Sequence, residues 1–215
     1  MMSYKVIAID GPAGAGKSTI AKKLADVIGY TYIDSGAMYR AITLKILVKN
    51  IPLKETEKLI SIAEETEIDF RDNSIYLDGI VVNDEIREER VSRNVSYVAA
   101  IPEIRKLMVD IQRKISRNKN VVMDGRDVGT VIFPQADVKF YITASVEERA
   151  ARRYNELKQK GYEAEIQDIK SQIAKRDHID STRSDSPLRA ADDAIIIDTT
   201  GKSIEEVLDE VISNI

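Results

Sequence analysis

The sequence contains no cysteine among its 215 residues. Disulfide bridges and thiolate zinc sites are excluded, because both need the cysteine sulfur. No apolar run approaches the roughly 20 residues that a membrane-spanning helix needs. The first apolar run, residues 6–9, is also far shorter than the apolar region of a signal peptide, which has about 7 to 15 residues. We therefore expect a cytoplasmic protein with no membrane partner.

The chain also lacks a positive net charge, since its formal charge is −4 at pH 7. A mildly acidic chain repels phosphate backbones, so we expect no nucleic-acid partner, although a local basic site is still allowed. Hydrophobic residues make up 43% of the sequence, which is ordinary for a globular protein. The length suits one well-buried domain, and we expect a single domain over residues 1–215 that acts as a monomer.

Short apolar runs recur along the whole chain and are expected to form strands. They are residues 6–9, 32–33, 120–123, 138–142 and 194–197. Continuous runs of this length suit strands that are buried on both faces of a parallel sheet.

The segments between these runs have helical patterns. Ile20, Leu24 and Ile28 share one face, and Gly29 follows as a stop. Residues 104–115 carry a second apolar face of this kind. Ser145 with Glu148 and Ser203 with Glu206 are spaced as capping boxes at the start of two more helices. Strand–helix alternation predicts an α/β fold with a doubly wound parallel sheet flanked by helices.

Residues 68–82 break this alternation. Asp72-Asn73 and Asp78-Gly79 are turn signals between short runs that favour strands. We therefore expect a small antiparallel sheet inserted into the α/β core. Such an insert is either a surface decoration or part of an arm that holds a substrate, and both interpretations stay open.

Residues 11–18 match the phosphate-binding pattern G-x-x-x-x-G-K-[ST] between an apolar strand and an amphipathic helix. The residues are Gly11, Pro12, Ala13, Gly14, Ala15, Gly16, Lys17 and Ser18, with Thr19 in the first turn of the helix. Glycines let backbone N–H groups converge on phosphate oxygens, and the helix start adds its positive dipole end. Lys17 would reach the β- and γ-phosphates of ATP, Ser18 would bind Mg²⁺, and Thr19 would contact the α-phosphate. The alternative is a chance match, and the motif alone does not separate a kinase from an ATPase or a GTPase.

Two loops bring arginines to the same edge of the predicted sheet. Arg40 lies in the segment 34–40 after the second strand, and Arg126 follows the third strand. Ligands of open α/β sheets bind at the carboxyl ends of the strands, and the arginine fork suits a second phosphate. Asp124 ends the third apolar run, where a carboxylate would meet Mg²⁺, directly or through water. The alternative for Asp124 is a turn or N-cap residue before a glycine.

Two further basic clusters occur late in the chain. One spans residues 175–185, and the other consists of Arg149, Arg152 and Arg153. A lid over about residues 149–165 is one interpretation, because a closed lid keeps water from competing with the acceptor. A solvated helix face is the other, and we expect it for Arg149. We interpret His178, the only histidine, as a structural or surface residue, because a phosphate acceptor is already anionic and needs no general base.

Several segments together resemble the bacterial-type cytidylate kinase family of P-loop nucleoside monophosphate kinases. They are residues 9–18, 34–40 with the letters D-S-G-A-M-Y-R, 124–134 with D-G-R-D-V-G-T-V-I-F-P, and the late segment 175–183. The second and third are far more specific than the phosphate-binding loop. The resemblance runs over essentially the whole chain, with Val128 standing where some members have methionine.

This resemblance implies a fold and an activity. The fold is that of a P-loop NTPase with a monophosphate-binding arm over about residues 36–110, containing the small antiparallel sheet, and a mobile lid over about 149–165. The activity is transfer of the γ-phosphoryl group of ATP to CMP or dCMP with Mg²⁺ as cofactor, in pyrimidine nucleotide metabolism. The implied partners are these small nucleotides.

The resemblance also assigns roles to residues by their numbers here. The catalytic residues are Lys17, Arg126 and Arg176. The CMP-binding residues are Ser35, Tyr39, Arg40, Ser96, Arg105, Arg126, Asp127, Arg176, Asp180 and Arg183. Ser96, Arg105 and Asp127 are the group that helps to recognise cytosine, and Asp180 is a ribose contact.

Two alternative functions stay open. The first is a kinase for another nucleoside monophosphate. The second is a nucleotide-dependent switch of the GTPase type, which needs an N-K-x-D segment, whereas residues 118–121 read N-K-N-V and lack the aspartate.

Overall fold

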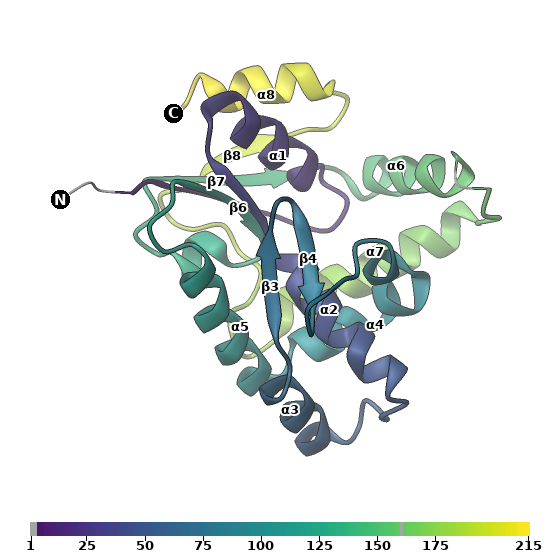
Figure 1. The fold of residues 1–215 in the computed structure, drawn as a ribbon. Coiled ribbons are helices and arrows are strands. Elements are labelled where there is room, and N and C mark those ends of the chain that lie inside the picture. Colours follow the sequence, from purple (N-terminus) through teal and green to yellow (C-terminus); the bar gives the residue numbers. More distant parts are fainter. Residues whose placement is uncertain (1–3, 160) are drawn as a thin grey trace.

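The computed structural model describes residues 4–159 and 161–215. Within these residues, five strands form one parallel sheet in the order β2-β6-β1-β7-β8 (Figure 1). The strands are β1 (Val6–Asp10), β2 (Thr31–Asp34), β6 (Val121–Gly125), β7 (Val138–Thr143) and β8 (Ile195–Asp198). The predicted parallel sheet and its five runs are confirmed.

Helices cover both faces of this sheet. Ile7 and Ile9 of β1 point to the face that α1 (Lys17–Ile28) and α8 (Ile204–Ile212) cover. Ala8 points to the other face and packs in the cluster that contains α2 (Ser35–Val48) and α5 (Pro102–Ile115). Figure 1 shows α1 and α8 together on one side of the sheet and α5 on the other. Burial of both faces explains why the strands are continuous apolar runs.

The predicted helix ends are confirmed with one correction. Gly29 ends α1 in the left-handed conformation, with its N–H bonded to Ala25. Ser203 and Glu206 form both halves of a capping box. The prediction of a full box at Ser145 was wrong. Its hydroxyl accepts from the Glu148 N–H, but its own N–H donates to Thr200, and the Glu148 carboxylate accepts from Arg152 instead.

The predicted antiparallel insert is confirmed as β3 (Ile68–Arg71), β4 (Ser74–Leu77) and β5 (Ile80–Val81). Asp72-Asn73 and Asp78-Gly79 have positive φ in the two tight turns, as hairpin turns require. Phe70 and Ile75 are buried in the same cluster as α2. The insert is therefore fixed to the core by apolar packing. Its role in an arm stays a prediction.

The remaining helices complete the described fold. They are α3 (Thr56–Glu64), the short η1 (Glu85–Arg87), α4 (Glu89–Ala99), the π-helical turn η2 (Val128–Ile132), α6 (Val146–Gln159) and α7 (Ile166–Thr182). Helices α6 and α7 pack on each other through a separate small cluster of Ala150, Ile169 and Ile173. The predicted lid, residues 149–165, covers most of α6 and the turn after it. Residue 160 lies outside the described residues, and the role of this segment as a lid stays a prediction. No helix in the described chain is long and apolar enough to cross a bilayer.

Candidate active site

A cleft lies between the phosphate-binding loop, α2, α4, α5 and α7. Every predicted CMP-binding residue lines it, and so do Ala13, Gly14, Lys17, Ser18 and Asp124. Asp34, Gly36, Val95, Ala99 and Gly125 also line it and were not predicted as site residues. Five predicted ATP-binding residues do not line the cleft, although they belong to the loop or to the first turn of α1. They are Gly11, Pro12, Ala15, Gly16 and Thr19. The fold therefore brings both predicted sites into one cleft.

The phosphate-binding loop links β1 to α1 by a tight path. A Cβ on Gly11 would lie 1.9 Å from the backbone oxygen of Ile142, so no other residue fits this position without a shift. The Lys17 amine is 5% exposed and donates to the Pro12 carbonyl over 2.7 Å. Burial lowers the pKa of Lys17 to about 7, and repulsion by Arg126 adds to this effect. An anion beside the amine would reverse that shift.

The predicted metal-binding pair is assembled. The Ser18 hydroxyl donates to Asp124 Oδ2 over 2.8 Å, and the Tyr32 hydroxyl donates to Oδ1 over the same distance. Burial raises the pKa of Asp124 to about 7, and nearby Asp34 contributes. The described residues contain no cluster of three or more His, Cys, Asp or Glu that could hold a metal. Two oxygen ligands beside a phosphate loop fit Mg²⁺, which binds through few protein groups together with phosphates and water.

Half-buried arginines gather at the end of the cleft nearest the loop. Arg126 Nε donates to Asp180 over 3.1 Å, and Arg176 Nε lies 3.8 Å from the same carboxylate. Arg40 donates to the Ile86 carbonyl and the Ser92 hydroxyl. Burial and repulsion among the arginines lower the pKa of Arg176 to about 9 and that of Arg40 to about 10. Such crowding is the electrostatic signature of an anion site.

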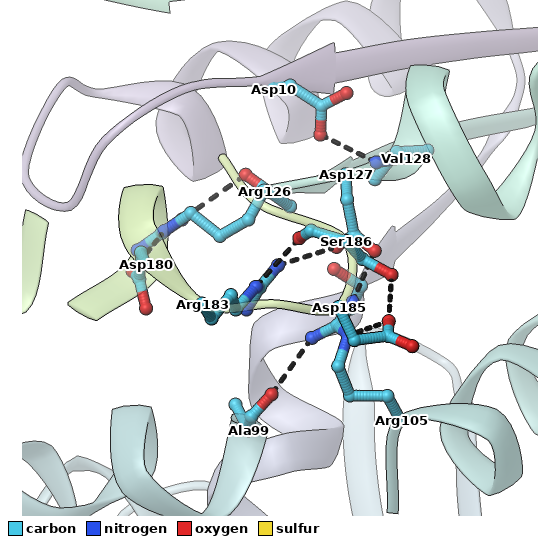
Figure 2. Close-up of polar contacts among 12 residues, drawn as sticks. Asp10, Ala99, Arg105, Arg126, Asp127, Val128, Asp180, Arg183, Asp185 and Ser186 are labelled. Atoms are coloured by element: carbon cyan, nitrogen blue, oxygen red, sulfur yellow. Dashed lines mark hydrogen bonds and ion pairs between the residues drawn. The ribbon is translucent and has the colours of Figure 1, made fainter. Parts of the chain in front are cut away.

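The other end of the cleft carries a paired set of charges. Arg105 forms an ion pair with Asp127 Oδ2 and donates to the Ala99 carbonyl over 3.1 Å. Arg183 Nη2 lies 3.5 Å from Asp127 Oδ1, so the carboxylate is held between two guanidinium groups (Figure 2). Asp185 lies 3.4 Å from Arg105 Nε.

Two hydroxyl groups at this end have no partner in the described chain. Tyr39 is stacked by the Arg105 guanidinium, which lies 5.4 Å from the ring centroid. Its hydroxyl and the Ser96 hydroxyl are both buried without a hydrogen bond. Buried polar groups normally have partners. Since both residues line the cleft, these hydroxyls are available to a ligand.

Sequence reasoning missed Asp10. Figure 2 shows its carboxylate aimed at the start of η2. It accepts from the N–H groups of Val128 and Gly129 over 2.8 and 2.7 Å. Burial raises the pKa of Asp10 to about 6 despite these bonds. Asp10 thus fixes the turn after Arg126 and Asp127. The only sequence signal for Asp10 was that a charged residue ends a buried strand. Tyr32, the second donor to Asp124, was missed as well.

The predicted solvated position of Arg149 was wrong. Its side chain is buried and bonded to backbone oxygens of Ala13 and Ala144 and to the Asp177 carboxylate. Arg152 bonds to Thr199, and Arg153 pairs with Glu156. His178 is exposed, as expected for a surface residue.

A phosphate-binding loop that shares its cleft with several arginines defines a P-loop kinase. The chain belongs to the cytidylate kinase family, whose model matches residues 7–215. It is 54% identical over 214 residues to a cytidylate kinase of Clostridioides difficile, covering 100% of this chain and 99% of the relative. It is 55% identical over 205 residues to a cytidylate kinase of Caldanaerobacter subterraneus, covering 95% and 92%. An uncharacterized protein from Eubacterium ventriosum shares the fold, with a TM-score of 0.55 at 14% identity over 99% of this chain and 98% of that one.

Proposed function

We propose that the chain transfers the γ-phosphoryl group of ATP to CMP, with dCMP as a second acceptor, to give ADP and the nucleoside diphosphate. The observation that carries this proposal is the single cleft in which the phosphate-binding loop, the arginines beside it and the Ser96–Arg105–Asp127 group converge. Membership of the cytidylate kinase family supports the same choice of acceptor.

The donor side binds ATP through the loop of residues 11–19. Its backbone N–H groups and the N-terminus of α1 face the phosphates, and Lys17 adds a charge toward the transferred group. Ser18 and Asp124 would hold Mg²⁺ together with phosphate oxygens and water. When bound, the ion neutralises charge on the phosphates. The Tyr32 bond keeps the Asp124 carboxylate oriented toward Ser18.

The acceptor phosphate lies among Arg40, Arg126 and Arg176 in this proposal. These arginines place a CMP oxygen in line with the γ-phosphorus, and they offset charge as the group transfers. The acceptor oxygen is already anionic, so no side chain has to remove a proton. Catalysis is therefore positioning and electrostatics, as in other phosphoryl transfers.

The base end distinguishes cytosine by its hydrogen-bonding pattern. Cytosine carries an amino donor at C4 and an acceptor at N3, whereas uracil carries an acceptor at O4 and a donor at N3. The Asp127 carboxylate and the Ser96 hydroxyl can accept from the amino group, and Arg105 can donate to a ring acceptor. A base with the reverse pattern leaves these buried groups unpaired, which weakens its binding. Asp180 and Arg183 flank the sugar between the two ends.

The arm over residues 36–110 and the lid over residues 149–165 close around the substrates in this proposal. Closure excludes water, which would otherwise accept the phosphoryl group.

A panel of acceptors tests the proposed function. ADP release from ATP and Mg²⁺ is measured with CMP, dCMP, UMP, AMP, GMP and dTMP separately, and without an acceptor. We expect release with CMP and dCMP and little with the others. Equal release without an acceptor would show an ATPase. Preference for another base would keep the kinase and reject the roles of Ser96, Arg105 and Asp127.

A further inference from the structure

We propose that Arg149 is a positioning residue that links the ATP-binding loop to helix α7, so that binding of one substrate orders the site of the other. This inference rests on the proposed function. Arg149 and Ala150 are the buried residues of α6, and Arg149 is 4% exposed. A buried guanidinium is costly unless acceptors surround it, so its partners indicate what it does.

The first partner is the phosphate-binding loop. Arg149 Nη1 donates to the Ala13 carbonyl over 3.1 Å, and Nε donates to the Ala144 carbonyl after β7 over 3.0 Å. A Cβ on Gly14 would lie 3.3 Å from the Arg149 Cβ, so the two backbones pack closely. Ala13 and Gly14 line the cleft while Arg149 does not, so Arg149 supports the loop from behind.

The second partner is helix α7. Arg149 Nη1 lies 2.7 Å from Asp177 Oδ2. Asp177 follows Arg176 directly and precedes Asp180 by three residues, and both of these neighbours line the cleft. The other Asp177 oxygen is buried without a hydrogen-bond partner in the described chain. Loss of Arg149 would remove the ion pair that ties this half-buried carboxylate, and with it α7, to the phosphate-binding loop.

Direct contact of Arg149 with a phosphate does not fit this geometry. Its Nε and Nη1 are both used on backbone oxygens and Asp177, and the side chain does not line the cleft. One guanidinium therefore joins the donor loop, the end of β7 and the acceptor-side helix. A shift of the loop on ATP binding is transmitted through Arg149 to Arg176 and Asp180.

Calorimetric titration of the whole protein tests this coupling. The dissociation constant of CMP is measured alone and with a saturating non-hydrolysable ATP analogue and Mg²⁺. In the wild type we expect the analogue to tighten CMP binding by a factor within the usual range for coupled sites, about 5- to 150-fold. In Arg149→Met, which keeps the aliphatic stem, this factor should fall close to one while CMP alone binds within about threefold of the wild type.

Two further variants separate positioning from a loss of folding. Arg149→Lys can keep one of the contacts and should retain an intermediate coupling factor, and it replaces Arg149→Met if that variant fails to fold. Arg93→Met is the matched control, because Arg93 forms an exposed ion pair with Glu89 on α4, and it should couple as the wild type does.

The outcomes decide the proposal. A wild-type coupling factor near one, or an unchanged factor in the Arg149 variants, would overturn it. Weaker binding of both ligands with the coupling factor preserved would show a merely structural role and would also overturn it. If CMP does not bind the wild type at all, the proposed function fails instead, and the acceptor found in the panel takes its place in the same titrations.

Discussion

The two ends of the cleft balance their charges differently. At the phosphate end, the cations are Lys17, which is buried, and Arg40, Arg126 and Arg176, which are half-buried. Within the described chain, Asp180 is the only carboxylate at ion-pair distance from any of them. At the base end, Arg105 and Arg183 share Asp127, and Arg105 also faces Asp185. The first end has surplus positive charge, whereas the second has as many carboxylates as guanidinium groups.

Under the proposed function, this difference explains what each end would recognise. Half-buried cations that outnumber their carboxylate partners cost free energy of folding, and a bound phosphate group would restore the charge balance. A charge-balanced end gains little from an anion. It distinguishes ligands by the direction of hydrogen bonds instead. The cleft therefore has surplus positive charge where the proposed function places the phosphates, and balanced charge where it places the base.

The largest effect is expected from Lys17→Met at the phosphate end. We expect kcat to fall by about 10²- to 10³-fold or more, because the charge acts on the transferring group. The free energy of unfolding should stay the same or rise slightly, because the variant removes a buried cation. Steady-state kinetics and denaturant unfolding measure the two quantities. Wild-type turnover would reject the role of Lys17, and a large loss of stability would contradict the surplus of charge.

Asp127→Asn at the base end should lower the free energy of unfolding, in contrast to Lys17→Met. The change leaves two buried guanidinium groups without their shared carboxylate, so we expect a loss of about 3 kcal/mol in the free energy of unfolding. The KM for CMP should rise at least about tenfold, while the KM for ATP changes little. An equal rise for both substrates would reject Asp127 as an acceptor-site residue.

Motifs predicted much of this arrangement. Residues 11–18 and 124–127 carry their chemistry in the local pattern, since strand, loop and helix start are contiguous there. The ten CMP-binding residues were assigned by the family resemblance, and all ten line the cleft. The apolar runs predicted the sheet because both of its faces are buried.

The missed residues depend on partners that are distant in the sequence. Asp10 bonds to Val128, which is 118 positions away, and Arg149 bonds to Ala13, which is 136 positions away. A helix rich in charged residues usually faces solvent, so the pattern around Arg149 favoured exposure. Packing of α6 against the loop and α7 overrides that preference. No local pattern carries this information.

Proton uptake on ligand binding should differ between the phosphate end and the base end of the cleft. The pKa of Lys17 is lowered to about 7 by burial, so the amine is mostly neutral at pH 8.5 in the free protein. Phosphates favour the charged amine, so ATP binding at this pH should take up protons, and affinity should fall as the pH rises above 7. The pKa of Asp124 is also about 7, so this carboxylate is already ionised at pH 8.5 and adds little.

Calorimetry in buffers with different ionisation enthalpies measures this uptake. Lys17→Met should abolish it, and CMP binding should show much less of it than ATP binding. Equal uptake in Lys17→Met and in the wild type would place the titrating group elsewhere.

The smallest effect is expected from Ser96→Ala, which tests whether the base end is complete in hydrogen bonds as well as in charge. The Ser96 hydroxyl is buried without a partner, so its removal should not lower the free energy of unfolding, because no protein hydrogen bond is lost. The ratio of kcat/KM for CMP to that for UMP should fall by about three- to tenfold. The hydroxyl oxygen can accept a hydrogen bond from the cytosine amino group, which uracil lacks. Ser61→Ala is the control, because Ser61 is exposed on α3. A loss of stability without a change in the ratio would mean that the hydroxyl has a structural partner. A fall in the ratio at unchanged stability would mean that the base end, although balanced in charge, also leaves a group for its ligand to complete.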